Sequence, residues 1–115
     1  MKPTIEYADF EKLELRVGKV TAATAPEWSN KLLQFTVDFG AELGIRTILS
    51  GVRKWYTPAD FEGKNFPFVI NLAERKMGQG VSQGMMIMGD VGEGEENRAV
   101  IMPLPAEIPA GSVLR

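Results

Sequence analysis

An alternation of apolar and polar residues with a period of two is the clearest pattern in this chain. From residue 33 to residue 39 the apolar positions are Leu33, Phe35, Val37 and Phe39. Such an alternation predicts a strand with one face in the core and the other in water. A glycine-bounded turn at 40–44 follows, and the segment 45–49 is the expected hairpin partner.

Further strands are predicted on both sides of this hairpin. Residues 13–17 alternate with the same period, and this strand is expected to continue to Ala23. Residues 66–72 are apolar on both faces, which is typical of a central strand. Shorter strands are expected at 84–88, at 99–102 and, as an edge strand, at 111–114.

Two short helices are also predicted. In the segment 7–13, Phe10 and Leu13 lie three residues apart and would share one helix face. Pro58 and Gly63 stand where a one-turn helix begins and ends. Many short strands with few helices predict a small all-β protein, and the pattern alone leaves a barrel and a sandwich equally open.

Length and composition indicate a single domain spanning residues 1–115 with one modest core. No apolar run approaches the roughly 20 residues that a membrane-spanning helix needs, so no membrane span is expected. The first residues lack the apolar core of a secretory signal, and the chain has no cysteine. Both features fit a cytoplasmic protein.

The absence of histidine and cysteine narrows the possible chemistry. It removes the usual zinc ligands and both the Ser-His-Asp and Cys-His catalytic arrangements. Carboxylates or a lysine with an altered pKa could still act as acid or base, but no sequence motif calls for them. We therefore expect a protein that is not an enzyme and that holds no metal and no cofactor.

The net charge and the local distribution of charge point to different kinds of surface. The net charge is −2 and the isoelectric point is about 5.2, whereas proteins that bind polyanions are ordinarily basic. Between Lys31 and Lys76, however, seven basic residues stand against five acidic ones. This excess indicates either a local basic patch or scattered cations in water, and charge counting alone favours the scattered cations.

The segment from Asn71 to Met86 has the character of a binding surface. It joins two cations to a glycine-rich turn and contains neither an acid–base pair nor a set of metal ligands. The candidate binding residues here are Asn71, Arg75, Lys76, Ser82 and Met85. Asn71 either caps the following turn or contacts a ligand, and these two interpretations stay open. Ser82 and Met85 could face outward as a hydroxyl donor and an apolar platform.

A second group of candidates precedes this segment. Lys31 lies where a loop meets a strand, so its ammonium either contacts a phosphate or is simply solvated. Arg53 and Lys54 stand beside Trp55 and Tyr56, and cations interleaved with rings suit single-stranded nucleic acid. The alternative is that the rings pack into the core. That alternative is favoured for Tyr56 and remains open for Trp55.

Taken together, ordered blocks along nearly the whole chain resemble a known family. The chain is similar to the bacterial tRNA-binding domain, which occurs as a free protein, as the C-terminal part of methionyl-tRNA synthetases and as the export chaperone CsaA. The blocks that carry the resemblance include Leu15-Arg-Val-Gly-Lys-Val20, Lys31-Leu-Leu33, Ser50-Gly-Val52, Asn71-Leu72, Arg75-Lys-Met77 and Ser82-x-Gly84-Met85.

The resemblance implies an OB-fold, a five-stranded barrel with a short N-terminal helix and extra C-terminal strands. It also implies non-catalytic tRNA binding by a homodimer, with an aminoacyl-tRNA synthetase as a possible further partner. A CsaA-like chaperone that binds unfolded polypeptide is the alternative. Matching the family's motif implies RNA contacts for Lys31, Asn71, Lys76, Ser82 and Met85, and less directly for Arg53, Lys54 and Arg75. The chain departs from the family pattern at Gly80, where a bulkier residue is common, and at Val81, where glutamate is frequent.

Overall fold

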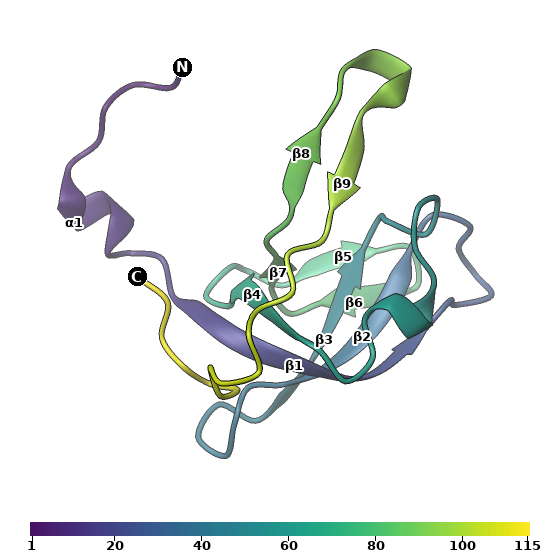
Figure 1. Cartoon of the computed structure of the whole chain (residues 1–115), viewed down its shortest axis with the longest axis horizontal. Coiled ribbons are helices and arrows are strands. Elements are labelled where there is room, and N and C mark those ends of the chain that lie inside the picture. Colours follow the sequence, from purple (N-terminus) through teal and green to yellow (C-terminus); the bar gives the residue numbers. More distant parts are fainter.

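The computed structural model describes residues 1–115 and consists mainly of β-strands (Figure 1). Five strands form one antiparallel sheet in the order β3-β2-β1-β4-β7. Their bounds are β1 Leu15–Thr24, β2 Leu33–Asp38, β3 Ile45–Ser50, β4 Asn65–Val69 and β7 Met85–Met86. The two end strands of this order, β3 and β7, also contact each other. The sheet therefore curls into a nearly closed barrel, and the predicted all-β, five-stranded OB-type architecture is confirmed.

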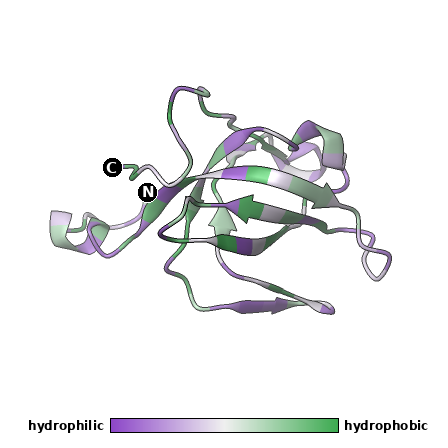
Figure 2. Cartoon of the chain, turned by 90° about the horizontal axis from the view of Figure 1, so that it is seen from below, coloured by the Kyte–Doolittle hydropathy of each residue, from purple (hydrophilic) through white to green (hydrophobic).

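The period-two alternation places the core inside the barrel. Leu33, Phe35 and Val37 of β2 are fully buried, and the residues between them are partly exposed. Figure 2 shows strands with alternating hydrophobic and hydrophilic bands along their length. Inside the barrel, the ring of Phe61 lies 4.5 Å from that of Phe35 and 5.5 Å from that of Phe66, measured between centroids. These packed rings form the centre of a single core cluster.

Gly18 allows β1 to pass close to this core. A Cβ atom built at residue 18 would lie 2.5 Å from Cγ1 of Val37 and 2.6 Å from the ring of Phe39. Both distances are shorter than van der Waals contact. A side chain at this position of β1 would therefore force the barrel wall outward.

Short elements complete the fold. The helices are α1 Tyr7–Phe10, η1 Pro58–Asp60 and η2 Gly94–Glu96, and two hairpins pair β5 Arg75–Met77 with β6 Gly80–Ser82 and β8 Gly89–Val91 with β9 Arg98–Val100. In Figure 1 the β8–β9 hairpin projects from the barrel, and the N-terminal segment with α1 extends away from it.

Several predicted boundaries need correction. The sequence predicted no strand at residues 75–77, but a tight turn at Gly78 folds β6 back onto β5 there. The predicted strand at 84–88 is shorter, since β7 ends at Met86 before the chain enters the β8–β9 hairpin. The expected edge strand at 111–114 is reduced to an isolated bridge between Arg16 and Val113.

The C-terminal segment lies along the first half of β1. The Val17 amide donates to Ser112 O at 2.9 Å, and the Leu114 amide donates to Leu15 O at the same distance. These bonds hold the end of the chain beside the start of the barrel. No helix of the structure is long and apolar enough to cross a membrane.

Candidate nucleic-acid interface

Three neighbouring hollows have Gly51 in their lining, and successive ones also share Trp55 or Met85; together we call them the central groove. The first, of about 530 Å³, is lined by Asn30, Lys31, Leu32, Gly51, Lys54 and Trp55. The second, of about 440 Å³, extends from Trp55 to Met85 and to Asp90 of β8. The third, of about 470 Å³, includes Leu72, Arg75, Met77 and Met85. Gly51 directly follows β3, so the groove crosses the end of that strand.

One end of the groove carries Lys31 and Lys54, which are both exposed. Arg53 lies between them in sequence but has a different role. Its guanidinium donates to Pro26 O at 3.0 Å and to Ser29 O, so it holds the loop that precedes Lys31. Arg53 thus stabilises a loop of the protein, and its RNA contact stays a prediction.

The two adjacent aromatic residues have separate environments. The Tyr56 hydroxyl donates to Ala99 O at 3.1 Å, and the Tyr56 ring meets Phe61 edge-on at 5.6 Å, so Tyr56 is anchored in the core. Trp55 is 37% exposed and lines the groove, with Nζ of Lys54 5.9 Å from its ring centroid. Of the two alternatives that the sequence left open for Trp55, the structure therefore shows the exposed ring and not the ring packed in the core.

The other end of the groove is built by the β5–β6 hairpin and β7. Arg75 and Met77 line the groove from β5. Lys76 lies between them, and successive strand residues point to opposite faces, so its side chain is on the other face of the hairpin. Met85 is 48% exposed and Leu72 is 45% exposed, which gives this end two apolar walls.

Trp28 holds the hairpin in place. A Cβ atom at Gly78 would lie 2.6 Å from the Trp28 ring, and one at Gly80 would lie 3.1 Å from that ring and 2.8 Å from Cδ1 of Leu49. Both glycines are thus needed where the indole packs against the hairpin. This contact gives a physical reason for the glycine at position 80, where the family pattern has bulkier residues.

The expected outward orientation of Ser82 is wrong. Ser82 is only 3% exposed. Its hydroxyl accepts a hydrogen bond from the Leu49 amide at 3.0 Å and donates to Gly84 O at 2.9 Å. The neighbouring Gln83 side chain accepts from the Thr47 amide at 2.9 Å. Ser82 and Gln83 thus supply hydrogen-bond acceptors for two amides of β3, which is an end strand of the five-stranded sheet. Through its bond to the Leu49 amide, Ser82 links the β5–β6 hairpin to β3.

Asn71 also makes contacts within the protein. Its Oδ1 accepts from the Glu14 amide at 2.8 Å, and its Nδ2 donates to Lys12 O at 2.6 Å. The side chain therefore fastens the N-terminal segment to the end of β4. This bridge is not a cap of the following turn, and a ligand contact of the exposed Asn71 stays a prediction.

The structure thus brings together part of the predicted set. One groove is lined by Lys31, Lys54, Arg75, Met85 and the buried Ser82, whereas Arg53, Asn71 and Lys76 do not line it. Sequence reasoning did not name Gly51 as a site residue, although it lies in the block Ser50-Gly-Val52 that carries the family resemblance. A Cβ atom at Gly51 would meet nothing within 4 Å, so this glycine lies on open space.

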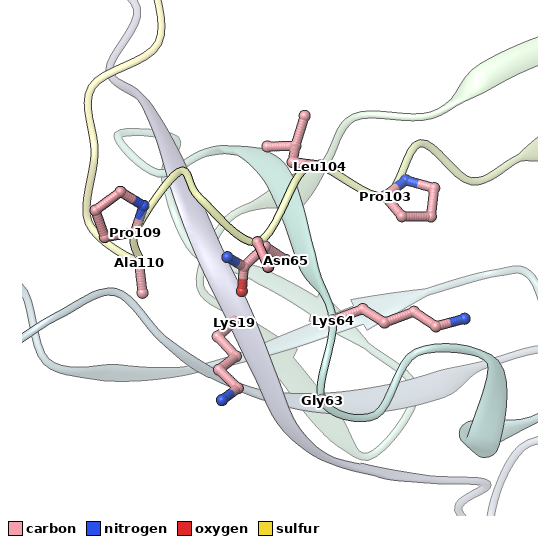
Figure 3. A pocket seen from close by; sticks show the side chains of 9 residues that line it. Lys19, Gly63, Lys64, Asn65, Pro103, Leu104, Pro109 and Ala110 are labelled. Carbon is pink, nitrogen blue, oxygen red and sulfur yellow. The ribbon is translucent and has the colours of Figure 1, made fainter.

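A separate hollow of about 380 Å³ lies where the C-terminal segment crosses β1 and β4 (Figure 3). It shares no lining residue with the central groove. Lys19 and Lys64 border it, but their side chains point in different directions in Figure 3. They therefore do not converge on one ligand atom.

A family model described as "Putative tRNA binding domain" matches residues 15–113. The chain belongs to this tRNA-binding domain family. Relatives named methionine–tRNA ligase include one from Chromobacterium violaceum, 53% identical over 85 residues, which are 73% of this chain and 12% of that protein. Another, from Bacteroides fragilis, is 39% identical over 115 residues, which are 100% of this chain and 16% of that protein. The chain therefore spans only a small part of the curated relatives it matches.

Solved structures agree with the tRNA-binding domain assignment. A crystal structure of a MetRS-related protein from Pyrococcus horikoshii has a TM-score of 0.90 and 32% identity, and the match covers 99% of this chain and 100% of that one. A crystal structure of the chaperone CsaA from Bacillus anthracis has a TM-score of 0.82 and 26% identity, with 98% and 100% covered. The structural neighbours thus include both a MetRS-related protein and a CsaA chaperone.

Proposed function

We propose that residues 1–115 form a single, non-catalytic tRNA-binding unit that contacts tRNA through the central groove and the cations around it. The observation that carries this proposal is the gathering of Lys31, Lys54 and Arg75 around one groove in a chain of the tRNA-binding domain family. The sequence relatives that are methionine–tRNA ligases support tRNA as the ligand.

The groove cations are free to meet phosphate. The ion pairs of the structure are Lys12 with Asp9 and Arg16 with Glu14, and neither involves a groove residue. Although the net charge of the chain is −2, the cations at the groove are not neutralised by ion pairs and can form a local cationic surface. Phosphate contacts by such residues fix the position of an RNA on the protein without reading its sequence.

A filter-binding titration with bulk tRNA at several salt concentrations tests the proposal. Three phosphate contacts predict that log K falls against log salt with a slope of about −2 to −3, because each neutralised phosphate releases counterions. Replacing Lys31 or Lys54 with Ala should reduce this slope by about one unit. Lys64→Ala, a cation outside the groove, is the matched control and should leave the slope unchanged. Absence of tRNA binding at low salt would contradict the proposal.

Lys76 belongs to the same test. Its side chain lies on the face of the β5–β6 hairpin that points away from the groove, and it is exposed. A folded tRNA is large enough to contact both faces of a three-residue hairpin. Lys76→Ala therefore decides whether the contact surface continues around the hairpin or ends at the groove.

The homodimer is a further part of this proposal. The helix α1 buries no residue, and Tyr7 is 67% exposed beside the exposed Ile5 and Leu13. Covering this apolar N-terminal segment with a second copy would remove it from water. Light scattering should then give twice the chain mass of 12.7 kDa, and a monomer would contradict this part. Association with a separate synthetase and a cytoplasmic location stay predictions.

The CsaA-like alternative has its own supporting observation. The groove end formed by Leu72, Met77 and Met85 is apolar, and the CsaA structure from Bacillus anthracis shares the fold. A chaperone of unfolded polypeptide would suppress aggregation of a denatured client, and salt would change this little. Salt-insensitive suppression without tRNA binding would favour this second function.

A further inference from the structure

We propose that the central groove takes an unpaired segment of RNA, with bases stacked on Trp55 and seated against Met85. This inference rests on the proposed tRNA binding and names the part of the RNA that is recognised. Contacts made only to the phosphates of a folded RNA need charge but no groove. The exposed apolar side chains in its lining, Trp55 and Met85, suit a ligand with flat, apolar parts.

Two exposed apolar side chains face the same hollow. Trp55 and Met85 both line the middle part of the groove, and Gly51 lies in its lining. Trp55 is held by its neighbours, since its amide donates to Val52 O at 3.0 Å and the following Tyr56 is anchored in the core. The indole is thus presented to solvent from a fixed backbone, which suits stacking of a nucleobase.

The charges along the groove fit a nucleic-acid chain. Lys31, Lys54 and Arg75 border it, whereas Asp90 is its acidic lining residue. Asp90 lies at the β8 end and accepts a hydrogen bond from Asn97 at 2.6 Å. A phosphate backbone that runs from the Lys31 end to Arg75 would pass the cations. A nucleotide stacked on Trp55 would lie beside the Lys54 ammonium.

Gly51 makes the inference testable without changing any charge. A Cβ atom added there meets nothing within 4 Å, and the backbone is not in the left-handed region. Gly51→Leu should therefore fold normally and fill the groove at the point where its three parts meet. A ligand that contacts only the cations would still bind, but a ligand that enters the groove would be excluded.

The experiment measures binding of bulk tRNA and of an oligoadenylate of about ten nucleotides, a length within the site sizes of OB-folds. Filter binding is compared for the wild type, Gly51→Leu, Trp55→Ala and the control Ala106→Leu, which narrows the separate hollow beside the C-terminal segment. Circular dichroism checks that each variant is folded. We expect Gly51→Leu and Trp55→Ala to weaken both ligands about tenfold, equivalent to about 1.4 kcal/mol for a lost stacking contact. Ala106→Leu should have no effect.

Fluorescence gives an independent measurement. The chain has two tryptophans, so in Trp28→Phe the remaining one is Trp55. We expect both RNA ligands to quench its emission, as stacking on the indole does. An alkylated, permanently unfolded polypeptide is the third probe and should leave the emission unchanged.

The outcomes separate this inference from the proposed function. If tRNA binds Gly51→Leu with wild-type affinity and salt dependence, the groove is not used and the inference fails while tRNA binding stands. If the unfolded polypeptide quenches Trp55 and loses affinity in Gly51→Leu, the groove belongs to a polypeptide and the inference is overturned. If the wild type binds no tRNA at low salt, the proposed function itself fails.

Discussion

Ser82 provides the sharpest test of the structure, because the family resemblance and the geometry assign it different roles. Ser82→Ala removes the hydroxyl that accepts from the Leu49 amide at 3.0 Å and donates to Gly84 O at 2.9 Å. At 3% exposure, water cannot replace the lost partner. A buried amide left without a partner costs about 1–3 kcal/mol. For a chain of this size, that cost corresponds to a fall in Tm of roughly 4 °C per kcal/mol.

Urea denaturation followed by circular dichroism measures this loss. The matched control is Thr21→Val, which deletes an exposed strand hydroxyl that donates to Thr36 O and should change stability by less than about 0.5 kcal/mol. In folded protein, Ser82→Ala should bind tRNA almost as tightly as the wild type. A stable Ser82→Ala variant with a large loss of tRNA affinity would refute the structural role and restore Ser82 as a direct RNA contact.

Two further substitutions test the packing that shapes the barrel and the groove. Gly18→Ala places a methyl group 2.5 Å from Val37 and should lower the free energy of unfolding, measured in urea, by about 1–3 kcal/mol. In the control Gly51→Ala the methyl group points into open space and should not destabilise the protein. Equal effects of the two substitutions would contradict the close packing of β1. Trp28→Ala removes the indole that covers Gly78 and Gly80 and should speed hydrogen exchange of the β5–β6 amides relative to Trp28→Phe. Unchanged exchange in Trp28→Ala would show that the hairpin does not depend on this contact.

The barrel could be predicted because its strands carry local signals. The alternation of Leu33, Phe35 and Val37 marked β2, and the apolar run at 66–72 marked β4 as an inner strand. The β5–β6 hairpin was missed because its strands have three residues each and its glycines resemble a loop. The indole of Trp28, which is distant in sequence, also packs against Gly78 and Gly80, and no local pattern reports such a contact.

The candidate site was predicted only in part for the same reason. The junction of a loop and a strand indicated Lys31, and cations beside rings indicated Lys54 and the Trp55 region. These residues meet at the groove. Asn71 and Ser82, by contrast, bond to Glu14 and Leu49, which are distant in sequence. A polar residue that satisfies a remote backbone amide cannot be told from one that contacts a ligand until the fold is known.

The most direct test of the binding surface is an NMR titration of isotope-labelled protein with tRNA at low salt. Binding at the central groove predicts the largest amide shifts at Lys31, Gly51, Trp55 and Arg75, with Lys19 and Lys64 little changed. Shifts concentrated around Lys19, Lys64 and Ala106, with the groove unperturbed, would contradict it and place the RNA on the other hollow.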